Sequence, residues 1–160
     1  SPAINALALA EAGAKSIAVD PRPDRIAQAR SAAESAGLRV EFHESDLADL
    51  GFATSASIDL VVAMGSLAAT DDLSRTLRQV HRVLKPECSL VISTLHPAFR
   101  LTDPDGPRYG AAPDRTVAEW FMSLYRANFR VDTLQELNRV GHPDDRVPYG
   151  LVIRARKLGV

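Results

Sequence analysis

Short runs of β-branched and other apolar residues alternate along this chain with longer alanine- and leucine-rich stretches of helical period. This alternation predicts repeated strand–helix units and a mostly parallel sheet. Strands are expected at residues 16–20, 38–42, 58–64, 90–95, 129–137 and 149–156. Helices are expected at residues 2–11, 24–36, 71–84 and 116–127. No helix separates the last two strands, so the sequence predicts that they pair antiparallel at the sheet edge.

Composition narrows the class of protein. The chain has 160 residues, of which 46% are hydrophobic and 24% charged, and its formal net charge is -1. This length predicts one domain over residues 1–160, and the near-neutral charge argues against a nucleic-acid partner. No apolar run approaches the ~18 residues of a membrane span, and no signal segment is evident. With Cys88 as the one cysteine, neither a disulfide nor a cysteine-based metal site is expected, so we expect a cytoplasmic protein.

Residues 97–113 break every periodicity. Prolines and glycines interrupt this stretch at Pro97, Pro104, Gly106, Pro107, Gly110 and Pro113. Structureless loops of this length in compact domains are usually lids, binding loops or disordered segments. The sequence therefore predicts a lid or substrate loop here.

Acidic residues close two of the predicted strands. In open parallel sheets, ligands bind outside the carboxyl ends of the strands. Asp20 ends one strand, where a carboxylate accepts hydrogen bonds from ribose hydroxyls; the alternative is a turn residue before Pro21. Asp46 follows the next strand, where it would accept from an adenine amine or cap the following turn.

Several segments together resemble a known family. These are Ser-Ile-Ala-Val-Asp at 16–20, Phe-His-Glu-Ser-Asp-Leu at 42–47, Ile-Asp-Leu-Val-Val at 58–62, Arg-Val-Leu-Lys-Pro at 82–86, and the closing pair at 128–131 and 151–157. In this order they resemble a class I S-adenosylmethionine-dependent methyltransferase of the small-molecule type. The resemblance covers nearly the whole chain. It implies a Rossmann-like, doubly wound α/β sheet, mostly parallel with an antiparallel last strand, in a three-layer sandwich.

The resemblance also implies a cofactor site for S-adenosyl-L-methionine. Its residues lie in pairs at three strand ends: Asp20 and Pro21, Asp46 and Leu47, and Ala63 and Met64. The first pair would hold the ribose, and the second would meet the adenine amine and ring. The third pair would line the methionine portion and the reactive methyl group.

Three departures from the family pattern stand out. The glycine-rich loop and the first strand that precedes it are absent from these 160 residues, which begin in the helix that would follow. We therefore expect an N-terminally incomplete domain, its first strand left out of these residues, cleaved off or supplied by another chain. Glu87 and Cys88 replace two glycines before the fifth family strand, which changes the turn geometry. Residues 67–69 lack the aromatic or histidine often found there.

Other residues near the strand ends are candidates for substrate chemistry. His96 closes a strand, where it would act as a general base or form backbone hydrogen bonds ahead of Pro97. Ser66 and the loop residues Arg100, Arg108 and Tyr109 would contact substrate or remain solvated.

The predicted function is S-adenosylmethionine-dependent methyl transfer to an oxygen, nitrogen or carbon of a small molecule, with a homodimer as one option. The alternative is an NAD(P)-dependent oxidoreductase, because an acidic residue after the second strand also suits the NAD ribose. No Tyr-x-x-x-Lys arrangement supports it. A third hypothesis is a catalytically degenerate methyltransferase-like binding domain, favoured by the missing glycine-rich loop. Inactivity of the incomplete form on its own is one of the expectations.

Overall fold

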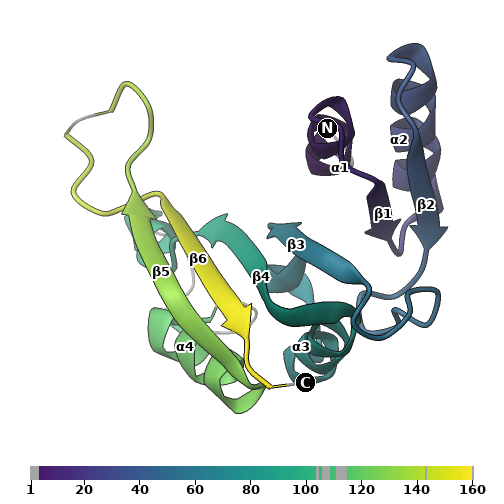
Figure 1. Cartoon of the computed structure of the whole chain (residues 1–160). Helices are drawn as coiled ribbons and strands as arrows, with labels where there is room; N and C mark the ends of the chain where they lie inside the picture. The colour runs from purple at the N-terminus through teal and green to yellow at the C-terminus, as the bar shows by residue number, and fades with distance from the viewer. Residues whose placement is uncertain (1–3, 104, 106–108, 111–114, 143, 160) are drawn as a thin grey trace. The chain divides into compact units, whose positions relative to one another are not determined.

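The computed structural model describes residues 4–103, 105, 109–110, 115–142 and 144–159 (Figure 1). The chain divides into two compact units, Ser1–Leu50 and Gly51–Val160. Each unit has its own sheet. Within the described ranges, no helix is long and apolar enough to cross a membrane.

As far as the structure describes it, the first unit contains two helices and a two-stranded sheet. Its elements are α1 (Ile4–Glu11), β1 (Ser16–Asp20), α2 (Pro23–Ser35) and β2 (Val40–Glu44). β1 and β2 are parallel, with Ser16 opposite Val40 and Asp20 opposite Glu44. Pro23 begins α2, as its fixed φ favours. The side chains buried here are small, mainly alanines, and Ile26 is one of the few larger ones.

The second unit contains a four-stranded mixed sheet. Its elements are β3 (Ile58–Met64), the short 3-10 helix η1 (Ser66–Ala69), α3 (Leu73–Val83), β4 (Leu84–Leu95), the 3-10 helix η2 (Phe99–Thr102), α4 (Val117–Arg126), β5 (Phe129–Leu137) and β6 (Gly150–Lys157). The strand order is β3-β4-β6-β5. β3 and β4 are parallel, whereas β6 is antiparallel to both neighbours. The predicted antiparallel pair is confirmed, with β5 at the edge and β6 inside the sheet.

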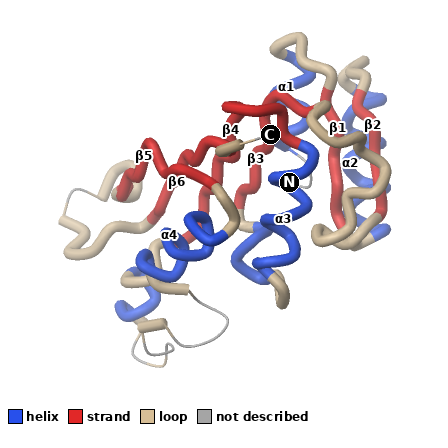
Figure 2. Tube along the Cα trace, turned by 60° about the horizontal axis from the view of Figure 1, so that its bottom comes forward, coloured by secondary structure: helices blue, strands red, loops and turns tan. Residues whose placement is uncertain are grey.

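Two helices cover the core of the second unit. α3 packs against β4, α4 packs against β5, and the helices contact each other (Figure 2). The fully buried large side chains come from these helices and from the sheet: Leu77, Val83, Leu84, Leu90, Ile92, Trp120, Leu124, Phe129, Leu151 and Ile153. Lys157 is also buried, and its Nζ donates to the Leu84 carbonyl at 2.9 Å. This carbonyl follows the C-terminus of α3, where a cation is favourable.

The start of β4 differs from the prediction. The strand was expected from residue 90, but pairing begins at Leu84, which lies opposite Ile58; the next pair is Leu60 with Ser89. The residues between form an irregular bulge. Within it, Glu87 adopts a left-handed φ of 62°, a conformation that favours glycine, at one of the two positions where the family pattern has glycine. The other predicted helices and strands form within a few residues of their expected bounds.

In the part of the chain that the structure describes, each sheet has two edge strands, β1 and β2 in the first unit and β3 and β5 in the second. Among the described residues, β1 pairs with β2 alone and β3 pairs with β4 alone. An unpaired edge exposes a row of backbone donors and acceptors. The predicted additional strand stays a prediction.

Candidate functional site

The predicted site residues gather at the carboxyl ends of the parallel strands in both units. In the first unit, Asp20 and Glu44 end β1 and β2 in register, and the Ser45 N–H donates to the Asp20 carbonyl at 3.4 Å. Asp46 therefore lies at the same edge as Asp20. In the second unit, Met64 lies opposite Ser93, so Ser66 and His96 follow strands that end at one edge. Each unit carries one part of the predicted constellation.

Asp20 is held ionised by its neighbours. Its side chain is 25% exposed. It accepts from the Arg22 backbone N–H at 3.0 Å and from the Arg22 Nε at 3.2 Å, and the Arg25 guanidinium lies 3.9 Å away. Partial burial by itself raises the pKa of Asp20, but the Arg22 hydrogen bonds and the two positive charges outweigh it, so the pKa lies below its ordinary value. At neutral pH this group is an acceptor for two hydroxyls.

Asp46 organises the turn after β2. Its Oδ1 accepts from the Ala48 N–H at 2.7 Å, and its carbonyl accepts from the Asp49 N–H at 2.9 Å. This is the capping geometry that the sequence allowed as an alternative. The Asp46 residue is exposed, as is Pro21, whereas Leu47 is half-buried.

β3 ends in a tight turn into η1. Ala63 is buried and Met64 is 55% exposed. Gly65 has a φ of 73° and donates its N–H to the Ser93 carbonyl at 2.7 Å. Ser66, the first residue of η1, is exposed. The turn therefore presents Met64 and Ser66 to solvent at the carboxyl edge of the sheet.

His96 is 5% exposed and hydrogen-bonded through both ring nitrogens. The Ala98 N–H donates to Nδ1 at 3.1 Å, and Nε2 lies 2.9 Å from the Glu136 Oε1. Because Nδ1 accepts, Nε2 carries the hydrogen and donates it to Glu136. A general base needs a free lone pair, and this arrangement leaves neither nitrogen free. The contacts match the alternative in which His96 secures the start of the loop.

The loop from residue 97 to 113 is described only in part. Arg100 lies exposed in η2, and Tyr109 is 49% exposed in a turn. Arg108 lies outside the described residues, as do 104, 106–107 and 111–113. The substrate roles predicted for Arg100 and Tyr109 therefore stay predictions.

The β5–β6 hairpin supplies partners that the sequence did not reveal. The Phe99 ring stacks edge-on against Tyr149 at 4.8 Å between centroids, and the Arg139 guanidinium lies 5.3 Å from the Phe99 centroid. Arg139 Nε also donates to the Asp145 Oδ2 at 2.8 Å. These contacts attach η2 to the hairpin. No local sequence signal could have found them, because Phe99 and its partners are about forty or more residues apart.

Arg115 is a second residue that the sequence did not reveal. It lies directly before α4, and its guanidinium donates to backbone carbonyls of η1 and of Thr70. The Thr-x-x-Glu pattern at residues 116–119 is a local signal for the helix start, but nothing in the sequence connects residue 115 to η1. Arg115 therefore joins the turn after β3 to the segment that follows the loop.

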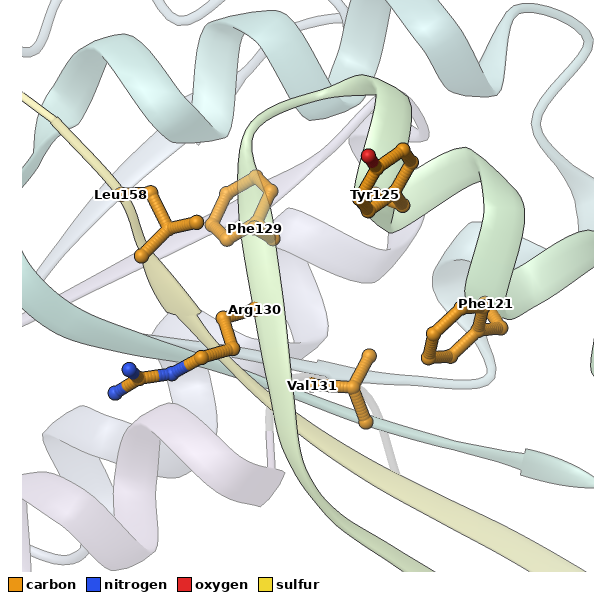
Figure 3. A pocket seen from close by; sticks show the side chains of 6 residues that line it. All are labelled: Phe121, Tyr125, Phe129, Arg130, Val131 and Leu158. Atoms are coloured by element: carbon orange, nitrogen blue, oxygen red, sulfur yellow. The ribbon is translucent and has the colours of Figure 1, made fainter.

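A cavity of about 150 Å³ lies elsewhere in the second unit (Figure 3). Its lining is mainly apolar: Phe121, Tyr125, Phe129, Arg130, Val131 and Leu158. The Arg130 guanidinium points away from the aromatic rings (Figure 3). The strand register places Phe129 beside Lys157, at the end of the hairpin opposite to Gly150, which pairs with Leu95 of β4 on one side and with Leu137 of β5 on the other. The cavity therefore lies away from the carboxyl end of β4 and contains none of the predicted site residues.

Comparison with known families identifies the class of protein. A family described as a methyltransferase domain matches residues 2–92. The chain therefore belongs to the methyltransferase domain family, and its fold and sequence place it among the class I S-adenosylmethionine-dependent methyltransferases, a family whose cofactor is S-adenosyl-L-methionine. This assignment argues against the NAD(P)-dependent oxidoreductase alternative.

One relative is a ubiquinone biosynthesis O-methyltransferase from Azorhizobium caulinodans, 33% identical over 91 residues. The match covers 55% of this chain and 34% of that protein. The chain thus spans about a third of the length of the curated relative that it matches.

Solved structures agree on the fold. A methyltransferase from Methanosarcina mazei superposes with a TM-score of 0.74 at 25% identity, covering 95% of this chain and 86% of that one. One from Mesorhizobium loti has a TM-score of 0.70 at 24% identity, with 89% and 80% covered. The cyclase SpnF has a TM-score of 0.78 at 20% identity, with 98% and 71% covered. The Rossmann-like α/β fold class is confirmed, and the cyclase shows that this fold also carries other chemistry.

Proposed function

We propose that this protein transfers the methyl group of S-adenosylmethionine to a nucleophilic atom of a small molecule. The observation that carries this proposal is Asp20, an ionised, part-buried carboxylate at the carboxyl end of β1. The residues of the chain suit the cofactor, since a carboxylate that only accepts hydrogen bonds matches two ribose hydroxyls. Its contacts to the Arg22 side chain, at 3.2 and 3.4 Å, are long and exposed, so hydroxyl groups can replace them.

The other proposed cofactor contacts also lie at the carboxyl ends of the parallel strands. Asp46 uses Oδ1 for the Ala48 N–H, and its other oxygen would accept from the adenine amine while Leu47 packs on the ring. Pro21 would border the ribose. Ala63 and Met64 would line the methionine portion.

When bound, the cofactor supplies an electrophilic methyl group on a sulfonium centre. The chain must therefore orient the acceptor and exclude water, and alignment alone can contribute roughly 7–11 kcal/mol to lowering a barrier. Ser66, Arg100 and Tyr109 are the proposed substrate contacts. The relative from Azorhizobium caulinodans is named as an O-methyltransferase, which favours oxygen over nitrogen or carbon as the accepting atom.

His96 is proposed as the general base, acting through Nδ1. Its Nε2–H is directed at Glu136, which would stabilise the ring after it gains a proton. The Ala98 N–H occupies Nδ1 at 3.1 Å, so the start of the loop must shift before this nitrogen can accept a proton from substrate. Without such a shift His96 acts only as an anchor.

We also propose that the domain requires a further strand and the glycine-rich loop for full cofactor affinity. The support is the free edge of β1 and of β3 in the described residues. A form of the protein that carries this segment should bind more tightly than the 160-residue chain. A homodimer remains part of the proposal and is tested by sedimentation of the same samples.

Titration calorimetry with S-adenosylhomocysteine tests the function, using both the longest natural form and the 160-residue chain. Binding by the longest form that Asp20→Ala abolishes would support the proposal. The matched control is Asp24→Asn in the first turn of α2, an exposed acidic residue of the same unit, which should leave the affinity unchanged. Because the pKa of Asp20 lies below its ordinary value, its contribution should stay constant from neutral pH down to about pH 5. Failure of both folded forms to bind would favour the degenerate binding domain.

A further inference from the structure

One guanidinium holds the turn after β3. Arg115 donates from Nη1 to the Leu67 and Ala68 carbonyls at 3.3 and 2.9 Å, and from Nη2 to the Thr70 carbonyl at 2.8 Å. Carbonyls at the end of a short helix have few partners within the helix; here the Leu67 carbonyl also accepts from the Thr70 N–H at 3.5 Å. A positively charged donor satisfies them strongly, because charge-assisted hydrogen bonds are stronger than neutral ones.

The start of α4 and the Trp120 ring hold Arg115 itself in place. The next residue, Thr116, caps α4: its hydroxyl accepts from the Glu119 N–H at 3.1 Å, and its N–H donates to the Glu119 Oε2 at 2.7 Å. The guanidinium also lies 5.6 Å from the centroid of Trp120, which is 2% exposed. The arginine therefore projects from a rigid helix start that is anchored in the core of the second unit.

The charge of Arg115 has no carboxylate partner in the part of the chain that the structure describes. Three carbonyl dipoles and the face of one indole ring balance it. An arginine kept only for surface charge would not need three convergent acceptors. The contacts instead fix where η1 lies relative to α4.

Other contacts of the residues in and around η1 also hold this short helix in place. Leu67 is 4% exposed, the Gly65 N–H donates to β4, and the Thr70 hydroxyl lies 3.4 Å from that of Thr76 in α3. Ser66 remains exposed at the start of η1, directly after Met64 and Gly65. Whatever sets the position of η1 therefore sets the position of Ser66 and of the turn that follows Met64, which itself pairs with Ser93 in the sheet.

We propose that Arg115 is a positioning residue for the methionine end of the cofactor site, acting through η1. The proposal rests on the function proposed above, which places Met64 at the methionine portion of the cofactor and Ser66 at the substrate. Lysine would replace arginine only in part here, since an ammonium keeps the charge but does not present its donors in a fixed planar fork. The start of α4 thus helps to build the binding site without contacting the ligand.

The structural half of the proposal is that Arg115 holds η1 in place, and hydrogen exchange tests it without any ligand. In Arg115→Gln, amides of residues 65–70 should exchange about tenfold faster or more, a factor that corresponds to the loss of roughly 1.4 kcal/mol. Those of α3 and α4 should keep their rates. The matched control is Arg126→Gln, which removes an exposed arginine at the other end of the same helix and should change nothing. Unchanged rates in 65–70, or equal acceleration throughout the second unit, would overturn the proposal.

Calorimetry with S-adenosylhomocysteine, on the longest natural form, tests the functional half. Arg115→Gln should weaken binding about tenfold or more, Arg115→Lys should be intermediate, and Arg126→Gln should match the wild type. Emission from Trp120, the one tryptophan of the chain, should change in the Arg115 variants alone. Faster exchange at η1 with wild-type affinity would overturn the functional half. If the wild type itself fails to bind, the proposed function fails, and the exchange result still decides whether Arg115 holds η1.

Discussion

The two units of this chain bury different kinds of side chain. In Ser1–Leu50, the most deeply buried apolar residues are Ala29 and Ala33, and Ile26 remains 8% exposed. In Gly51–Val160, Leu77 and Leu124 are fully buried, together with Trp120 at 2%. Burial of a large apolar side chain contributes roughly 1.5–3 kcal/mol. The second unit therefore has a core of its own, whereas the first has little to stabilise it.

The two sheets also indicate that the second unit is the more strongly stabilised of the two. The first unit has two strands among its described residues, 4–50, and a sheet this small is marginally stable unless other elements pack on it. The second unit has four strands, with β4 and β6 paired on both sides. The comparison teaches that the part carrying Asp20 and Asp46 depends more on additional contacts than the part carrying Met64, Ser66 and His96.

The largest expected effect concerns the two cores. Leu77→Ala should lower the free energy of unfolding of the second unit by about 2–5 kcal/mol, because it leaves a cavity at a fully buried site. Ile26→Ala, its counterpart in α2, should open the first unit while the second keeps its protection. Denaturant unfolding combined with hydrogen exchange measures both. If each variant opened both units alike, the distinction between the units would be wrong.

A middle-sized effect is expected at the bulge in β4. Glu87 has a left-handed φ of 62°, which costs a residue with a Cβ atom roughly 1–2 kcal/mol. Glu87→Gly should therefore raise the melting temperature of the second unit, partly offset by the greater entropy of glycine in the unfolded chain. Glu87→Ala is the control, since it removes the carboxylate and keeps the Cβ atom. An equal gain in both variants would assign the effect to charge instead of backbone strain.

The smallest expected effect is on how the stability of the second unit changes at acid pH. Asp132 accepts from the Nε atoms of Arg154 and Arg156, at 2.7 Å each. The Arg154 hydrogen bond is the largest influence, and with that of Arg156 it holds the pKa of Asp132 below its ordinary value. Because its pKa is lower in the folded state, ionised Asp132 stabilises the fold at pH values above the unfolded pKa of about 3.9. This stabilisation is lost as the pH falls through the folded-state pKa.

Asp132→Asn should therefore destabilise the second unit at pH 7 by no more than about 1 kcal/mol, the upper range for exposed ion pairs. The deficit should shrink as the pH falls below about 4. Urea unfolding at a series of pH values measures it. A deficit that persisted undiminished in acid would show that packing, and not charge, connects Asp132 to β6.

Sequence patterns predicted the elements well because their signals are local. Strand 58–64 and strand 129–137 form with the expected bounds, and the helix expected at 116–127 is Val117–Arg126. The start of β4 was missed because residues 85–88 form a bulge whose pairing depends on β3. Polar residues such as Lys85 and Glu87 carry no strand signal of their own.

The sequence predicted individual site residues at the ends of single strands, but not the contacts between distant segments. Asp20 was expected at the carboxyl end of a strand and lies there. The partner of His96, Glu136, is 40 residues away, and Arg115 is 45–48 residues from the carbonyls that it holds. No periodicity encodes such contacts, because they depend on which helix and which hairpin lie beside the strand.

The sequence by itself determined the order of helices and strands, the family and the carboxylate positions at the strand ends. These follow from local propensity and from the rule that parallel strands end at one edge. Only the tertiary structure decided that β6 lies between β4 and β5, that both nitrogens of His96 are occupied, and that Arg115 holds η1. The physical reason is that hydrogen bonds and ring contacts act over a few ångströms, so they depend on which distant segments the fold brings together.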